Sequence, residues 1–205
     1  EAEKIMDEAY KYYADEWKEE PRDTKEARLK FYKNSIYNSF DLARWHQADK
    51  KPKSTYEETC DEGLTCIRGL HKQCKVLDYA AGIGSLCIKL AQEGHEVHYY
   101  DIGIITRKFA EYRCKRYNAN VIFHESVSTI PQNYFDVAVC YDTIEHLDDD
   151  EMYFALTRIY SALHLNGRLV PRGPFPATIE ECEAKASHLA EHVGKNQKSI
   201  FPMLE

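Results

Sequence analysis

The spacing of apolar residues divides the chain into two unlike parts near residue 72. In the first part, apolar and aromatic residues recur every three or four positions, as on one face of a helix. Examples are Ile5, Ala9 and Tyr12, and then Leu29, Tyr32, Ile36 and Phe40. Pro21 and the polar stretch 50–54 interrupt this pattern. We therefore expect roughly three helices and no strand in residues 1–72.

From Lys75 onward, short apolar runs alternate with amphipathic segments. The runs typical of buried strands are KVLDYA, EVHYYD, VIF, FDVAVCY and GRLV. Strands that alternate with helices form a parallel sheet with helices on both faces. The sequence therefore predicts an α/β fold in two parts. Residues 73–205 form a doubly wound, mostly parallel sheet, and residues 1–72 form an N-terminal helical cap over the site.

Composition and charge limit the class of protein. The chain has 27 lysine and arginine residues and 34 aspartate and glutamate residues. The resulting net charge of −7 gives no long-range attraction for nucleic acid. The basic residues between 107 and 116 are spread around one helix, and we interpret them as a solvated face. No apolar run is long enough to cross a membrane. The acidic start at Glu1 is unlike a secretory signal and suggests a trimmed or non-native terminus.

The cysteines indicate a reducing compartment. They are Cys60, Cys66, Cys74, Cys87, Cys114, Cys140 and Cys182, an odd number without a C-x-x-C pair. Their spacing lacks the ligand pattern of a zinc site. We therefore expect a cytoplasmic protein with reduced thiols and no structural zinc, and its oligomeric state stays open.

The residues that carry the most chemistry follow the first predicted strand. Gly82 and Gly84 stand where that strand turns into a helix, so the backbone there can approach a ligand closely. Asp101 ends the next strand, where a carboxylate can accept hydrogen bonds from ribose hydroxyls. Position 87 is Cys, where a dinucleotide fingerprint requires its third glycine. Because Asp78 adds negative charge near the loop, a cationic adenosine cofactor is favoured over NAD.

These residues resemble the first motif of the class I, Rossmann-like S-adenosylmethionine-dependent methyltransferases that act on small molecules. The resemblance extends from about residue 75 to residue 170 and includes the segment FDVAVCYDTIEHLDD. It implies S-adenosylmethionine as cofactor, with S-adenosylhomocysteine as product. The implied cofactor-binding residues are Asp78, Ala80, Gly82, Gly84, Asp101, Ile102, Glu125, Ser126 and Asp142. Ala80 replaces the first glycine of the family, and either Glu125 or Ser126 is expected to reach the adenine.

Methyl transfer from a sulfonium is an in-line substitution, so the protein mainly aligns the acceptor and excludes water. A base is needed only if the acceptor must lose a proton. His146 and His188 are the candidate bases, and Asp142 is a candidate to orient an amine or hydroxyl. The acceptor is expected to be a small molecule, methylated on an O, N or C atom that the sequence does not identify.

Two other functions stay open. The first is a divalent-metal-dependent O-methyltransferase that uses Asp142, Glu145 and His146 together with His188 or His192. The second is a non-catalytic binding or scaffold protein that keeps the fold. A degenerate relative would be expected to lose the glycine loop or Asp101, and this chain keeps both.

The end of the chain departs from the resemblance, which implies seven strands where the sequence predicts five. The fifth is GRLV, Gly167–Val170, and Pro171 limits it to the edge or end of a sheet. A helix is expected from about 178 to 195. We expect that the edge is covered by the N-terminal helices, by the 178–195 helix or by a second subunit, unless the chain is truncated.

Overall fold

The computed structural model describes residues 24–46, 63–70 and 72–173, together with seven single positions between residues 4 and 19. Within them, five parallel strands form one sheet in the order β3-β2-β1-β4-β5. The strands are β1 Lys75–Tyr79, β2 Glu96–Tyr100, β3 Val121–His124, β4 Phe135–Tyr141 and β5 Leu163–Arg172. The predicted α/β fold with a doubly wound parallel sheet is confirmed.

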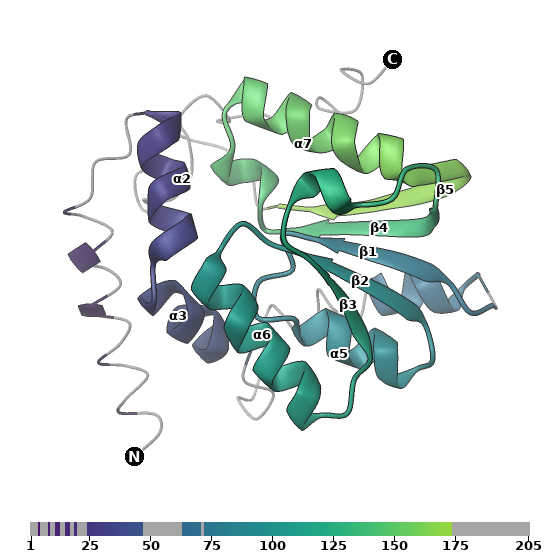
Figure 1. Ribbon diagram of the computed structural model, residues 1–205, viewed down its shortest axis with the longest axis horizontal. Coiled ribbons are helices and arrows are strands. Elements are labelled where there is room, and N and C mark those ends of the chain that lie inside the picture. Colours follow the sequence, from purple (N-terminus) through teal and green to yellow (C-terminus); the bar gives the residue numbers. More distant parts are fainter. Residues whose placement is uncertain are drawn as a thin grey trace.

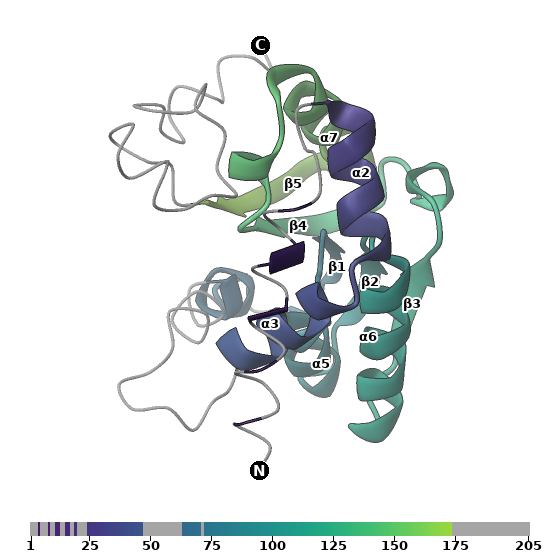
Figure 2. The same cartoon turned by 90° about the vertical axis from the view of Figure 1, so that its left-hand side faces the viewer.

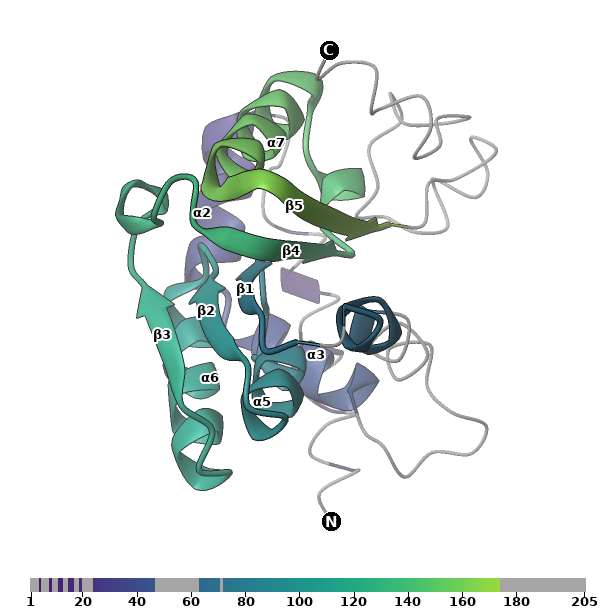
Figure 3. The ribbon, with the colours of Figure 1, turned by 90° about the vertical axis from the view of Figure 1, so that its right-hand side faces the viewer.

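Helices cover both faces of the sheet, as Figures 1 and 3 show. On one face lie α5 Ser85–Gln92 and α6 Ile104–Arg116, and on the other lies α7 Asp149–Ala162. Neighbouring residues of each strand point to opposite faces, so Val76 joins the core under α5 while Leu77 joins the core under α7. Burial on both sides explains why these strands are continuous apolar runs.

The acidic cluster of the sequence EHLDDDE begins α7. The Asp148 side chain accepts a hydrogen bond from the Glu151 amide at 2.9 Å, and the Glu151 side chain accepts one from the Asp148 amide at 3.1 Å. This reciprocal capping satisfies two amides that the helix itself leaves without partners. The cluster thus has a structural role at the helix start, where negative charge also suits the helix dipole.

The N-terminal helices lie at the carboxyl end of the strands (Figures 1 and 2). They are α2 Lys25–Asn34 and α3 Tyr37–Trp45, and residues 63–68 are also helical. Arg28 of α2 forms ion pairs with Asp148 and Glu151 at the start of α7. No strand occurs among the described residues before Lys75, as predicted. The domain boundary near residue 72 stays a prediction.

The fifth strand is longer than predicted. It begins at Leu163, directly after α7, instead of at Gly167, and it ends at Arg172. Residues 164–166 are polar or exposed and carry no apolar pattern, and they lie at a register shift between the pairs Phe135–Leu163 and Val137–Arg168. Pro171 lies near the strand end beside Cys140, and β5 pairs only with β4 within the described part of the chain. The predicted 178–195 helix lies outside the described residues, and the covering of this edge stays a prediction.

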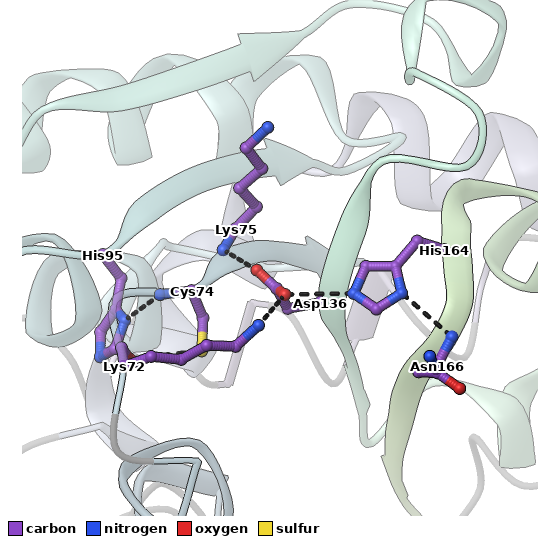
Figure 4. A network of polar contacts seen from close by, with 7 residues as sticks. All are labelled: Lys72, Cys74, Lys75, His95, Asp136, His164 and Asn166. Atoms are coloured by element: carbon purple, nitrogen blue, oxygen red, sulfur yellow. Dashed lines mark hydrogen bonds and ion pairs between the residues drawn. The ribbon is translucent and has the colours of Figure 1, made fainter.

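At the amino end of the strands, one carboxylate connects three segments (Figure 4). Asp136 of β4 accepts hydrogen bonds from the Lys72 ammonium, the Lys75 amide and the His164 ring. Burial alone would raise the pKa of Asp136, but these hydrogen bonds outweigh it and lower the pKa to about 2. The carboxylate therefore ties the starts of β1, β4 and β5 together, far from the carboxyl end where the predicted site lies.

The five described cysteines are free thiols: Cys66, Cys74, Cys87, Cys114 and Cys140. Cys60 and Cys182 lie outside the described residues. Within the described segments, no helix has the length and apolar character needed to cross a membrane.

Candidate functional site

The described residues of the predicted site follow the carboxyl ends of four adjacent strands. Asp78 and the glycine loop belong to β1, Asp101 follows β2, Ser126 follows β3 and Asp142 follows β4. In an open parallel sheet, these ends meet on one side, which is where ligands bind. The strand order therefore brings together side chains that are up to 64 positions apart in the sequence.

The loop between β1 and α5 has an unusual backbone. Ala80, Gly82 and Gly84 have φ values of 60°, 53° and 71°, in the left-handed region that favours glycine. The Tyr99 hydroxyl donates a hydrogen bond to the Gly82 carbonyl at 2.7 Å. Ala80, at the position of the family's first glycine, adopts the conformation that glycine would favour. The loop is therefore an ordered turn in which the backbone of Ala80 is strained.

Asp101 faces this loop. Its Oδ2 accepts a hydrogen bond from the Gly82 amide at 2.9 Å, and its Oδ1 accepts one from the Gly103 amide at 2.7 Å. Burial raises the pKa of Asp101 even though both amides favour its charged form. The carboxylate therefore lies against the glycine loop, held by one backbone amide of the loop and one of its own turn. Ile102, the next residue, is partly exposed at the same edge.

Asp78 is buried at the end of β1, and its partner was not predicted. The Cys87 thiol of α5 donates a hydrogen bond to Asp78 Oδ2 at 3.1 Å. Burial and the nearby Asp101 charge together raise the pKa of Asp78 to about 7, against the effect of the thiol hydrogen bond. The sequence marks Cys87 only as the residue at the third-glycine position of the motif. It does not predict the hydrogen bond to Asp78, because that contact joins a helix to a strand.

The two candidates for adenine contact are both at the surface. Ser126 begins the short helix η1 Val127–Thr129, and its hydroxyl accepts a hydrogen bond from the Ser128 amide at 3.3 Å. Glu125 is exposed and lies 3.9 Å from the Arg107 guanidinium. Thr129 holds this turn by donating to the Ser126 carbonyl at 2.8 Å. The geometry leaves both residues as candidates.

The residues after β4 surround the short helix η2 Ile144–His146. Asp142 is exposed and has a φ of 46°, and its amide donates to the Arg172 carbonyl at 2.8 Å. Strained backbone of this kind is common at functional sites. The His146 ring lies 6.2 Å from the Tyr32 ring of α2, measured between ring centres. The cap thus reaches the candidate base.

The metal alternative depends on residues from two regions. Glu145 is 1% exposed, and its Oε1 lies 4.0 Å from His146 Nε2. Within the described part of the chain, no group of three or more His, Cys, Asp or Glu side chains could hold a metal ion. His188 and His192 lie outside the described residues.

One sequence interpretation is corrected by the structure. Arg113 was assigned to a solvated basic face, but its guanidinium turns back to the glycine loop between β1 and α5. It donates hydrogen bonds to the Ile83 carbonyl and to the Ser85 hydroxyl. Helical spacing places a residue on a face of its own helix, but a long arginine side chain can reach a neighbouring loop. The sequence also gave no signal for His46, which contacts the same hydroxyl.

Residues 76–167 match the family model described as a methyltransferase domain. No curated protein matches the chain. Among solved structures, magnesium protoporphyrin IX methyltransferase from Synechocystis PCC 6803, with bound SAH, is 19% identical. The match covers 79% of this chain and 76% of that one, with a TM-score of 0.60.

Two further structures have the same fold. The PH0226 protein from Pyrococcus horikoshii OT3 is 21% identical over 62% of this chain and 60% of its own, with a TM-score of 0.54. The 1,6-didemethyltoxoflavin-N1-methyltransferase from Burkholderia thailandensis, with bound 1,6-didemethyltoxoflavin and S-adenosylhomocysteine, is 21% identical over 74% of this chain and 64% of its own, with a TM-score of 0.51. The chain thus spans less than two thirds of the length of these two proteins.

The sequence match and the fold agree with the resemblance drawn from the motifs. Residues 76–167 match the methyltransferase-domain family model, and they lie on a parallel sheet with the same fold as the magnesium protoporphyrin IX methyltransferase.

Proposed function

We propose that the protein is an S-adenosylmethionine-dependent methyltransferase that moves a methyl group to an O, N or C atom of a small molecule. The observation that carries the proposal is the Asp101 carboxylate held against the Gly82 amide at 2.9 Å, within a matched methyltransferase domain. This is a polar ribose-type site at the carboxyl end of a parallel sheet.

The residues fit this cofactor. Ala80, Gly82 and Gly84 bring the backbone of the loop close to a ligand, and Asp101 offers carboxylate oxygens to the ribose. Asp78 places a second carboxyl group at the start of the loop, and a bound ligand that carries a positive sulfonium would favour the ionised form of this group. S-adenosylmethionine supplies an activated methyl group when it is bound there.

The chain's own contribution is alignment and the exclusion of water. The helices α2 and α3 cover the carboxyl end of the strands, which supports a role in shielding the reaction (Figure 2). His146 is the candidate to accept a proton from an acceptor that must lose one, and Asp142 is the candidate to orient it. His188 is a further candidate base, outside the described residues.

A small-molecule acceptor is supported by two observations. The net charge of −7 does not attract a phosphate backbone. Two structural relatives are methyltransferases of magnesium protoporphyrin IX and of 1,6-didemethyltoxoflavin. These relatives share the fold, and their acceptors support a small molecule as the class of acceptor.

Calorimetry with S-adenosylhomocysteine tests the proposal. The wild-type protein should bind it and should not bind NAD. Asp101→Ala should weaken binding about 30-fold, or about 2 kcal/mol, because charge-assisted hydrogen bonds are lost. Asp150→Ala, which removes an exposed carboxylate on α7, is the matched control and should leave the affinity unchanged. Equal affinities of the wild type and Asp101→Ala for S-adenosylhomocysteine would refute the assignment of Asp101 to the ribose.

A further inference from the structure

One face of α3 rests on the elements that hold the cofactor loop. Ser39, Leu42 and His46 are three and four positions apart and therefore share a helical face. The Ser39 hydroxyl lies 3.1 Å from the Thr106 hydroxyl of α6. Leu42 Cδ1 lies 3.3 Å from the position that a Cβ atom on Gly82 would occupy. The N-terminal segment therefore contacts the glycine loop directly.

His46, just after α3, makes the polar contact of this face. Its Nδ1 lies 2.9 Å from the Ser85 hydroxyl, in the first turn of α5 after the glycine loop. The Arg113 guanidinium donates to the same hydroxyl at 2.8 Å, and a guanidinium can only donate. Ser85 can then direct its own hydrogen to His46 Nδ1. The three side chains form one chain of hydrogen bonds from α6 to the cap.

This chain of hydrogen bonds ends on the loop itself, because Arg113 also donates to the Ile83 carbonyl between the two glycines. Burial, together with the positive charges of Arg113 and Lys89, lowers the pKa of His46 to about 3. His46 is therefore neutral near pH 7, and its ring keeps one nitrogen that can accept a hydrogen bond.

We propose that His46 is a positioning residue of the cofactor site, which fixes the glycine loop through Ser85 and so couples cofactor affinity to the docking of α3. The inference rests on the proposed function and extends the role of α3, which then belongs to the cofactor site as well as to the N-terminal helical cap. Because coupling between sites is reciprocal, cofactor binding should also stabilise α3 against local opening.

A double-mutant cycle with S-adenosylhomocysteine tests this coupling. His46→Ala and Ser85→Ala should each weaken binding about tenfold, and the double variant should be little weaker than either one. His46→Asn keeps an acceptor near the position of Nδ1 and should retain most of the affinity. Thr24→Ala removes the N-cap of α2, whose hydroxyl accepts from the Ala27 amide. This control should lower stability without changing the affinity.

The outcomes separate the two proposals. Failure of the wild-type protein to bind S-adenosylhomocysteine refutes the proposed function, and the inference with it. Binding by the wild type with unchanged affinity in His46→Ala, or with additive losses in the cycle, refutes the inference alone. Amide hydrogen exchange on the wild-type protein tests the coupling without any variant, so it applies even if a variant does not fold. Bound S-adenosylhomocysteine should slow amide exchange at least threefold in residues 37–45, and an unchanged rate there also refutes the inference.

Discussion

The Cys87 thiol and the Asp78 carboxylate form a hydrogen bond of 3.1 Å between α5 and β1, beneath the glycine loop. In a dinucleotide fingerprint, position 87 would hold a glycine that allows close helix–strand packing. Here the thiol occupies that space and is fully buried. Burial and the neighbouring Asp101 carboxylate both favour the protonated form of Asp78 near neutral pH. The Cys87 thiol is a weak donor and does not outweigh them.

Asp78 should make the ligand-free protein less stable as the pH rises. Burial raises its pKa in the folded state to about 7, and the unfolded value is about 3.9. The stability from the neutral form is therefore complete below about pH 4 and is lost as the pH rises through about 7. Asp78→Asn mimics the neutral form, so its stability relative to wild type should rise between about pH 4 and pH 7 and then level off. Urea unfolding at several pH values measures this, and parallel curves would refute it. Asp150→Asn is the exposed control.

Ala80→Gly should be tolerated or stabilising. A left-handed conformation costs a non-glycine residue about 1–2 kcal/mol, and glycine costs about 0.5–1 kcal/mol in the entropy of the unfolded chain. Since Ala80 has a φ of 60°, the exchange should gain up to about 1 kcal/mol. The adjacent Ala81 is buried and has no positive φ, so Ala81→Gly should lose about 1 kcal/mol. Denaturant midpoints compare the pair, and a larger loss in Ala80→Gly than in Ala81→Gly would contradict this account of the loop.

Asp136→Asn should destabilise the sheet by about 2 kcal/mol at neutral pH, because charge-assisted hydrogen bonds to three segments are weakened. The pKa of about 2 in the folded state lies below the unfolded value of about 3.9. The stabilisation is therefore present above about pH 4 and is lost as the pH falls through about 2. Wild type and variant should converge in acid. Lys72→Met removes an exposed partner of Asp136 and should lower the stability by less. If the two variants lost equal stability, the ion pair with Lys72 alone would account for the stabilisation, and this prediction would be wrong.

Divalent ions should not change the stability of the protein. We expect an unchanged melting temperature with a chelator, and also with Mg²⁺ or Mn²⁺ at about 1 mM, because a ligand that binds the folded state raises the melting temperature. A metal-induced shift that disappears in His146→Ala would instead favour the metal-dependent O-methyltransferase. Asp142, Glu145 and His146, together with His188 or His192, would then be its ligands.

The alternation of apolar runs predicted the parallel sheet because the central strands β1, β2 and β4 are buried on both faces and are therefore largely apolar. The same reasoning missed the start of β5, where residues 164–166 carry no apolar pattern and lie at a register shift between the pairs Phe135–Leu163 and Val137–Arg168. Strand order decided which predicted residues meet. Asp101 was assigned to the ribose from its place at a strand end, and the structure adds its hydrogen bond to Gly82, nineteen positions earlier.

The sequence by itself determined the fold class, the glycine loop and the acidic residues at the strand ends, because each depends on short-range pattern and on the direction of the chain. Only the tertiary structure decided the partners of those residues. Cys87 reaches Asp78, Arg113 reaches Ile83, and His46 reaches Ser85, each across a boundary between elements. Such contacts depend on the packing distance between elements and on the reach of a side chain. Neither quantity is encoded in the periodicity of a single segment.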